Sequence, residues 1–335
     1  MPSSAFIGAA CSTGYGEGLV KAALGADFGE VETVAHCAAA ATLSHNVEAV
    51  LDIGGQDMKF LRVKDGVVSS ILLNEACSSG CGSFLETFAR SMGYGAEEFS
   101  RLALESRAPV DLGSRCTVFM NSRVKQAQKE GASPADIAAG LAYSVIKNAL
   151  QKVIRIRNPK ELGAVVVVQG GTFSSEAVLR AFELISGRDS IRPAESGLMG
   201  AYGAALIARS RSKRERSALL GPTELSSFSA TSESARCKGC GNACLLTITS
   251  FEGSSAKVYV TGNRCERGAA LIETARGIVP SAEKRDAAHR EVPPDLYAWK
   301  YERLFRYIPL EEGKARRGKG RGSMGRHSRG RIGHG

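Results

Sequence analysis

An acidic, glycine-rich turn stands where a buried strand is expected to end. The apolar run at residues 47–51 is followed by Asp52, Ile53, Gly54, Gly55, Gln56 and Asp57. Glycine lets backbone N–H groups approach phosphate oxygens, and a carboxylate accepts hydrogen bonds from Mg²⁺-bound water. We expect Asp52 to act on Mg²⁺-bound water, and Gly54, Gly55, Gln56 and Asp57 to line nucleotide phosphates. Aspartate and glycine also build simple turns, so the prediction needs a second motif.

The second motif is a glycine pair after another apolar strand. Residues 165–168 are all valine, and Gln169, Gly170 and Gly171 follow before a predicted helix at 176–185. Side chains at the two glycines would block a flat ligand from the backbone, so this turn suits adenosine. A plain strand-to-helix turn is the alternative. Together with Asp52 upstream, the pair favours ATP or ADP with Mg²⁺.

Two cysteines, Cys77 and Cys116, each directly precede a segment with helical periodicity. The amide N–H groups and dipole of a helix N-terminus stabilise a thiolate or the anionic sulfur of a cluster. Two thiolates suffice for neither a zinc nor an iron–sulfur site, which normally take four. A two-fold dimer would supply four ligands on one axis. The alternative is that both are buried apolar cysteines.

Four further cysteines lie near the C-terminal end of the chain. Cys237, Cys240 and Cys244 are closely spaced, and Cys265 follows a hairpin-like segment at 245–260. The count matches a structural zinc site or a second iron–sulfur cluster. A metal is favoured because clustered thiols without one would be exposed and oxidisable. The short loop favours zinc, whereas a redox relay beside the first cluster would favour iron–sulfur.

Six runs of the sequence resemble the ATP-dependent activators of 2-hydroxyacyl-CoA dehydratases, relatives of the ATPase subunits of benzoyl-CoA reductase: residues 52–59, 74–86, 116–128, 135–152, 165–173 and 196–208. The resemblance covers roughly residues 13–209, with a weaker extension through the later cysteines. It implies a homodimer that holds one [4Fe-4S] cluster between subunits, through Cys77 and Cys116 of each chain. It also implies reduced ferredoxin or flavodoxin as electron donor, and a dehydratase or related reductase component as partner.

The elements that must position these residues follow from periodicity. Period-two patterns predict strands at 50–53, 58–63 and 67–72, and a further strand at 164–168. Helices are expected at 12–25, 31–43, 84–92, 118–129, 135–155, 176–185 and 197–206. We expect His36, in the second of these, to be a hydrogen-bonded core histidine rather than a ligand of nucleotide or cluster.

This order of elements predicts an α/β ATPase lobe of the actin, Hsp70 and sugar-kinase type, which is ribonuclease H-like. No glycine- and Ser/Thr-rich phosphate hairpin precedes Asp52. We therefore expect a nearly complete second lobe with a fragment of the first, and ATP hydrolysis only in an intact protein. The predicted division is 1–48 partial first lobe, 49–209 second lobe, 210–235 linker, 236–275 cysteine-rich metal-binding segment, 276–312 docking stretch and 313–335 disordered basic tail.

Composition bounds the environment and the partners. The net charge is +10, but eight basic residues lie at 314–331, where no acidic residue occurs. The rest of the chain therefore predicts no specific nucleic-acid surface. Nine cysteines in irregular spacing favour a reducing compartment over a disulfide framework. Neither a signal peptide nor an apolar run that could span a membrane is found. We expect a cytoplasmic protein.

The sequence therefore predicts an activator that couples ATP hydrolysis to low-potential electron transfer. A phosphotransferase of the sugar-kinase type on the same fold is the alternative. It would need a catalytic aspartate in a substrate cleft and no cluster, and Cys77 and Cys116 at helix starts argue against it. A third interpretation is a non-catalytic metal-binding fragment.

Overall fold

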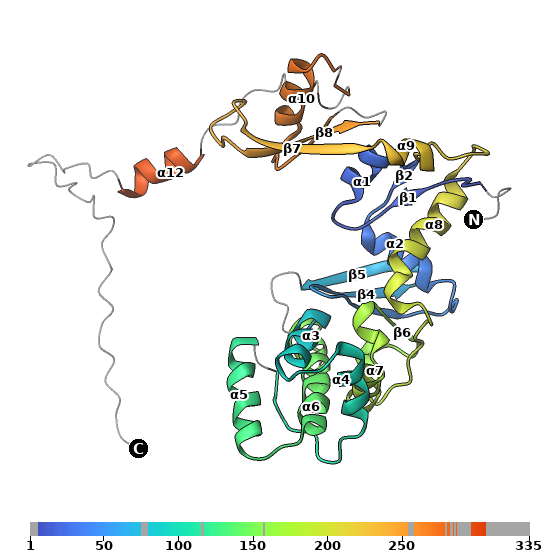
Figure 1. Cartoon of the computed structure of the whole chain (residues 1–335), viewed down its shortest axis with the longest axis vertical. Helices are drawn as coiled ribbons and strands as arrows, with labels where there is room; N and C mark the ends of the chain where they lie inside the picture. The colour runs from blue at the N-terminus through green and yellow to red at the C-terminus, as the bar shows by residue number, and fades with distance from the viewer. Residues whose placement is uncertain are drawn as a thin grey trace, which may run out of the picture. The chain divides into compact units, whose positions relative to one another are not determined.

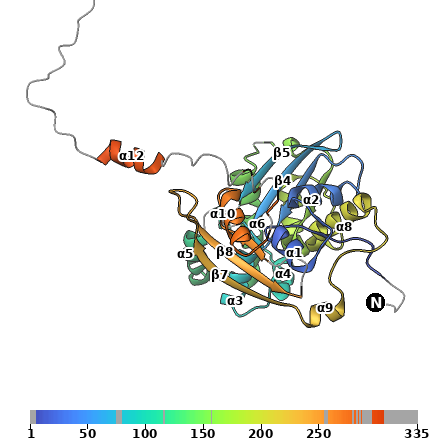
Figure 2. The ribbon, with the colours of Figure 1, turned by 90° about the horizontal axis from the view of Figure 1, so that it is seen from above.

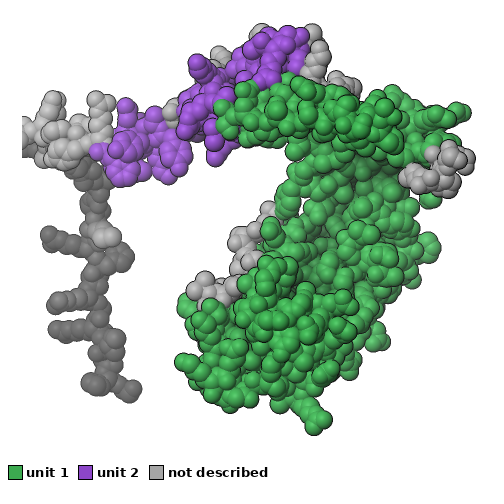
Figure 3. Space-filling view, in the orientation of Figure 1, with its two compact units in different colours: residues 1–234, 247–261 green, residues 235–246, 262–335 purple. Residues whose placement is uncertain are grey.

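The structure, a computed structural model, describes residues 6–74, 80–114, 117–156, 158–253, 258–278, 280–281, 284, 286 and 296–305. The chain divides into two compact units (Figure 3), one of residues 1–234 and 247–261 and one of residues 235–246 and 262–335. Among the described residues, no helix is both long and apolar enough to cross a lipid bilayer.

A four-stranded sheet forms the centre of the first unit, with strand order β5-β4-β3-β6. The strands are β3 (Ala49–Ile53), β4 (Met58–Lys64), β5 (Val67–Asn74) and β6 (Val166–Gln169). β4 runs antiparallel to both β3 and β5, whereas β6 runs parallel to β3. Asp65 and Gly66, both with positive φ, join β4 to β5 in a tight hairpin. The strands predicted from period-two patterns are confirmed.

One face of this sheet packs against a layer of helices that includes α3, α4, α6 and α7 (Figure 1). The helices that follow β5 are α3 (Gly82–Ser91), α4 (Ala96–Leu104), α5 (Thr117–Lys129) and α6 (Pro134–Lys147), and α7 (Glu176–Ser186) follows β6. Helix α4 was not predicted. The helix predicted at 135–155 is α6 followed by a π-helix at Asn148–Val153. The main hydrophobic core lies between these helices and the sheet.

The opposite face of the sheet carries α2 (Glu32–Ala40) and α8 (Met199–Arg211), which lie side by side (Figure 1). Their backbones touch at Gly203, where a Cβ would lie 1.8 Å from the carbonyl oxygen of Ala35. Only glycine permits this approach. Beside them, β1 (Cys11–Ser12) and β2 (Phe28–Gly29) form a two-stranded parallel sheet, and α1 (Glu17–Leu24) packs on it.

A three-stranded sheet, order β7-β8-β9, lies farther along the chain (Figure 2). The short helix α9 (Pro222–Ser226) precedes β7 (Ser229–Arg236), and β8 (Leu245–Glu252) pairs antiparallel with β9 (Val258–Thr261). The stretch at 210–235, interpreted as a linker, thus contains a helix and most of a strand. Its Ser, Thr and Glu side chains are mostly exposed, so the strand lacks the alternation of apolar residues that would have revealed it.

The second unit contains the segment with Cys237, Cys240 and Cys244, then α10 (Glu266–Ala275) and α12 (Leu296–Phe305). Helix α12 lies within the stretch predicted to dock a partner, and its large side chains are exposed, Trp299 among them. The predicted basic tail at 313–335 lies outside the described residues.

Candidate functional site

The two glycine turns lie at the same edge of the central sheet. β3 and β6 are parallel neighbours, and Asp52 at the end of β3 pairs with Gln169 at the end of β6. The carboxyl ends of adjacent parallel strands are where open α/β sheets bind ligands. Tertiary structure therefore brings together the two motifs that the sequence predicted to share one nucleotide.

The first turn closes on itself through the backbone. The N–H group of Gly54 donates to the carbonyl oxygen of Asp57 over 3.0 Å, so residues 54–57 form one tight loop. Gly55 and Gln56 at its tip are exposed. Their exposure leaves room beside the turn, and phosphate binding there stays a prediction.

Each glycine pair contains one glycine with a close neighbour and one that faces open space. A Cβ on Gly54 would lie 2.6 Å from Oδ1 of Asp57, and one on Gly170 would lie 2.3 Å from the carbonyl oxygen of Ile53. A Cβ on Gly55 or Gly171 would meet no atom within 4 Å. Gly54 and Gly170 thus allow the chain to fold closely, and Gly55 and Gly171 leave room for a ligand.

The start of α3 is bonded directly to the first turn. The N–H of Gly82 donates to the carbonyl oxygen of Gly54 over 2.9 Å, and the N–H of Ser83 donates to that of Gly55 over 2.8 Å. The hydroxyl of Thr172, in the second turn, also donates to Gly54 over 2.8 Å. Two N–H groups that a helix usually leaves unpaired are therefore used to hold the glycine turn.

Asp52 is almost completely buried, with 3 % of its surface exposed. Burial raises the pKa of its carboxyl, while nearby His36 and Lys59 act in the opposite direction. Its Oδ2 lies 3.1 Å from Nδ1 of His36 but accepts no well-aligned hydrogen bond within the described part of the chain. Asp52, the residue predicted to act on Mg²⁺-bound water, thus has a buried carboxylate oxygen that lies near His36 but lacks a well-aligned hydrogen bond.

A buried set of charges surrounds Asp52. Nζ of Lys59, whose side chain is 4 % exposed, lies 3.0 Å from Oε1 of Glu32 and also pairs with the carboxylate of Asp57. The hydrogen bond from His36, together with Lys59, lowers the pKa of Glu32 to about 2. Burial alone would lower the pKa of Lys59, but the bonds from Asp57 and Glu32 raise it instead. The site thus couples the first turn to α2 through paired charges.

Cys77 and Cys116, the predicted ligands of an intersubunit cluster, lie outside the described residues. Helix α5 begins at Thr117, directly after Cys116, as predicted. Cys77 was predicted to stand directly at a helix start, but α3 begins at Gly82 and its N-cap residue is Cys81. The amides of Gly82 and Ser83 are bonded to the glycine turn, which explains why the helix starts there. Cys81 itself is fully buried.

The later cysteines lie on a compact backbone loop. The N–H of Cys237 donates to the carbonyl oxygen of Cys244 over 2.8 Å, and the N–H of Gly239 approaches Sγ of Cys237 at 3.4 Å. Cys265 is the N-cap residue of α10, and a Cβ on Gly268 in that helix would lie 3.3 Å from Sγ of Cys237. The segments that carry Cys237, Cys244 and Cys265 therefore lie close together. In the described part of the chain, however, no three His, Cys, Asp or Glu side chains converge as a metal-binding group.

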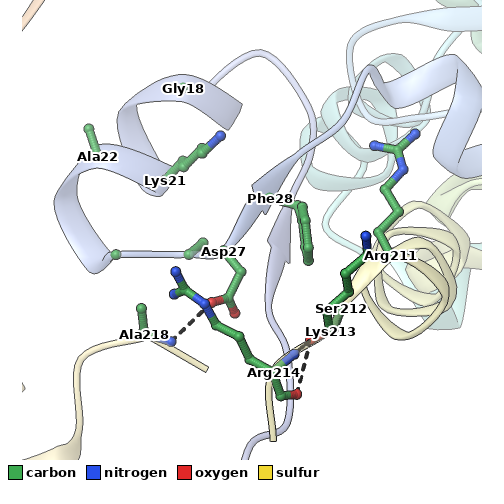
Figure 4. A pocket seen from close by; sticks show the side chains of 12 residues that line it. Gly18, Lys21, Ala22, Asp27, Phe28, Arg211, Ser212, Lys213, Arg214 and Ala218 are labelled. Carbon is green, nitrogen blue, oxygen red and sulfur yellow. Dashed lines mark hydrogen bonds between the residues drawn. The ribbon is translucent and has the colours of Figure 1, made fainter. Parts of the chain in front are cut away.

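A separate basic cavity of about 620 Å³ lies between α1 and the segment that follows α8 (Figure 4). Lys21, Arg211, Lys213 and Arg214 line it, along with Asp27. The Asp27 carboxylate accepts hydrogen bonds from the backbone N–H groups of Ala10 and Ala218. None of the predicted nucleotide residues lines this cavity.

Sequence reasoning missed several residues around Asp52. His36 is a buried, hydrogen-bonded histidine, as expected, but it also touches the predicted catalytic aspartate. Glu32, Lys59 and Gln169 received no role. The i,i+4 spacing of Glu32 and His36 could have indicated that these two side chains are in contact on one helix. No local pattern indicated that either lies beside Asp52.

Residues 5–208 match the BadF/BadG/BcrA/BcrD ATPase family. The (R)-2-hydroxyglutaryl-CoA dehydratase activating ATPase of Acidaminococcus fermentans is 32 % identical over 197 residues, which cover 59 % of this chain and 74 % of that protein. The 2-hydroxyisocaproyl-CoA dehydratase activator of Clostridioides difficile is 33 % identical over 168 residues, or 50 % of this chain and 62 % of that one.

A solved structure agrees with these sequence relatives. The activator of the 2-hydroxyisocaproyl-CoA dehydratase from Clostridium difficile, determined with bound ADPNP, has a TM-score of 0.54 and 32 % identity to this chain. The match covers 60 % of this chain and 73 % of that one. The predicted resemblance is confirmed, and the mixed α/β fold is that of an activator ATPase.

Proposed function

Because this chain belongs to the BadF/BadG/BcrA/BcrD ATPase family, we propose that it is an activator that couples ATP hydrolysis to electron delivery in its intact form. The recipient is a 2-hydroxyacyl-CoA dehydratase or a related acyl-CoA reductase component. Two relatives that carry dehydratase activator names support this proposal, as does the activator fold.

The nucleotide is assigned to the two turns at the ends of β3 and β6. The open glycine Gly55 lies where the phosphates are assigned, with Gln56 exposed beside it, and the open glycine Gly171 lies where the adenosine is assigned. Mg²⁺ neutralises phosphate charge during phosphoryl transfer, and Asp52 is the residue assigned to its bound water. The unmet polar requirement of Oδ2 of Asp52 fits a carboxylate that awaits a further partner.

The observation that carries the coupling is the bonding of α3 to the phosphate turn. Gly54 and Gly55 accept hydrogen bonds from the first two N–H groups of α3, and the segment immediately before this helix contains Cys77. A change in the turn on hydrolysis would therefore act directly on the anchor of that segment. Thr172 bonds the second turn to the same carbonyl group of Gly54, so both halves of the nucleotide site share the junction.

The electron carrier is assigned to Cys77 and Cys116 from two copies of the chain. Four thiolates around one two-fold axis would hold a [4Fe-4S] cluster, which supplies one-electron chemistry when bound. Cys116 directly precedes α5, whose first N–H groups favour negative charge on sulfur. Reduced ferredoxin or flavodoxin is the proposed donor.

A second metal site is assigned to Cys237, Cys240, Cys244 and Cys265. The N–H of Gly239 directed at Sγ of Cys237 is supporting geometry, since such bonds stabilise thiolate sulfur. The four side chains would have to turn toward one another on binding, because they do not converge in the described part of the structure. Metal would then also contribute to the folding of this loop.

The test combines anaerobic iron and sulfide analysis with ATP binding and hydrolysis. We expect Cys77→Ala and Cys116→Ala to lose about four iron atoms per dimer and to dissociate. Cys81→Ala is the matched control, because its thiol is fully buried within the chain, and it should remain dimeric and brown.

The outcomes distinguish the three interpretations. Nucleotide binding without iron would favour the sugar-kinase-like phosphotransferase, and iron without nucleotide binding would favour a non-catalytic metal-binding scaffold. Loss of iron in Cys81→Ala with no loss in Cys116→Ala would refute the two-chain ligand set.

A further inference from the structure

His36 contacts the carboxylate that the nucleotide site depends on. Its ring, 7 % exposed on α2, places Nδ1 3.1 Å from Oδ2 of Asp52 and 2.5 Å from Nε2 of Gln169. The other ring nitrogen, Nε2, lies 3.3 Å from Oε1 of Glu32. One imidazole on α2 therefore contacts the ends of two neighbouring strands, β3 and β6.

The surroundings hold this ring in one orientation. Glu32 contacts Nε2, and Lys59 contacts the same oxygen of Glu32, so the carboxylate cannot turn away without breaking an ion pair. Gly200 of α8 backs the ring, since a Cβ there would lie 3.2 Å from Nε2 of His36. The Glu32 contact on Nε2 directs the other ring nitrogen, Nδ1, toward Asp52 and the side-chain amide of Gln169.

The carboxylate that Nδ1 faces is that of Asp52. Its Oδ2 is buried and has no well-aligned donor within the described residues, and Nδ1 of His36 is 3.1 Å away. Leaving a buried carboxylate oxygen without a donor is costly. When both ring nitrogens carry a proton, Nδ1 of His36 lies 3.1 Å from Oδ2 of Asp52 while Nε2 donates to Glu32. We propose that His36 is a positioning residue, which holds the Asp52 carboxylate in place through Nδ1 while Glu32 and Lys59 hold the ring.

This inference rests on the proposed ATPase function, because Asp52 has a catalytic role only there. A displacement of about 1 Å in a catalytic group can cost roughly a hundredfold in rate. Loss of the Nδ1 contact should therefore lower kcat about ten- to a hundredfold with little change in KM, since it misplaces a group used in the transition state.

Two substitutions, His36→Asn and His36→Gln, distinguish the roles of the two ring nitrogens. The side-chain nitrogen of asparagine reaches about where Nδ1 lies, and that of glutamine about where Nε2 lies. His36→Asn should keep kcat within a few-fold of wild type, whereas His36→Gln should show the full loss. Val34→Ala, at an exposed position on the same helix, controls for general effects on α2. Equal kcat for His36→Gln and wild type would overturn the proposal.

A double-mutant cycle tests whether His36 acts through Asp52. If it does, adding His36→Gln to Asp52→Asn should change kcat no further, whereas additive losses would show a separate role and overturn the proposal. A second readout is independent of turnover: the factor by which Mg²⁺ strengthens ATP binding should fall in His36→Gln and be restored in His36→Asn. An unchanged factor in His36→Gln would likewise refute the positioning role.

ATP binding and hydrolysis by the wild-type protein distinguish failure of this inference from failure of the proposed function. Full-length wild-type protein that neither binds nor hydrolyses ATP refutes the function itself and, with it, any role of His36 in hydrolysis. Wild type that hydrolyses ATP with the same kcat as His36→Gln refutes only the positioning role.

Discussion

Replacing Gly170 by alanine should destabilise the first unit strongly, whereas the same change at its neighbour Gly171 should not. Gly170 has φ 92° and ψ 156°, a conformation available almost only to glycine. Its added Cβ would also lie within 2.8 Å of the backbone N, C and O atoms of Ile53. Gly171 has neither problem, because its φ is not in the left-handed region and its Cβ would meet open space.

The expected magnitude follows from these two effects. Backbone strain of this kind costs about 1–3 kcal/mol, and forcing an extra methyl group into a packed site costs about 1–3 kcal/mol more. Gly170→Ala should therefore lower the free energy of unfolding by about 3 kcal/mol or more, which for a unit of this size lowers Tm by roughly 6–12 °C. Gly171→Ala should stay within about 0.5 kcal/mol of wild type.

Chemical and thermal unfolding followed by circular dichroism would measure both variants, and a titration with Mg-ATP would follow. Gly171→Ala should weaken nucleotide binding while leaving stability unchanged, because its methyl group fills space reserved for the ligand. Equal loss of stability in the two variants would refute the assignment of one glycine to packing and the other to the ligand. Unchanged ATP affinity in Gly171→Ala would remove that turn from the nucleotide site.

Three further predictions concern charge and metal. In a full-length version of the protein, Asp52→Asn should reduce ATP turnover far more than ATP affinity, because its charge acts during phosphoryl transfer; steady-state kinetics beside calorimetric binding would check this, and unchanged turnover would exclude Asp52. Cys240→Ser should release metal and increase proteolysis of the second unit, as measured by metal analysis and limited trypsin digestion. Ionised Glu32 has a folded pKa of about 2, below its ordinary 4.5, so its stabilisation is present above pH 4.5 and is lost as pH falls toward 2. Glu32→Gln should therefore flatten the pH dependence of stability in that window, which urea unfolding at several pH values would show, and parallel profiles would contradict it.

Much of the fold was predictable because its signals are local. The period-two runs that became β3, β4 and β5 and the apolar run of β6 were recognisable without any partner. Elements with weaker local signals were missed. β7 is polar and mostly exposed. The short helix α4 lies between the two cysteine motifs.

In the candidate site, too, residues with local signals were predicted and residues with distant contacts were missed. Asp52 and the glycine pairs were predicted as nucleotide residues from residue type and spacing, because phosphate binding needs a carboxylate and free backbone groups wherever the turn lies in space. The roles of His36, Gln169 and Thr172 depend on contacts with residues far away in sequence. His36 and Gln169 are 133 positions apart, and Thr172 and Gly54 are 118 apart.

The sequence by itself therefore indicated the family, the main strands and the residues predicted to bind a nucleotide. Only the tertiary structure decided which glycine of each pair packs and which remains open, where α3 begins, and which histidine faces Asp52. The physical reason is that these properties are set by distances between elements, such as the contact of Gly170 with Ile53 and the bonds from α3 to Gly54 and Gly55. Local propensity does not encode those distances, because they exist only once the sheet has brought β3 and β6 together.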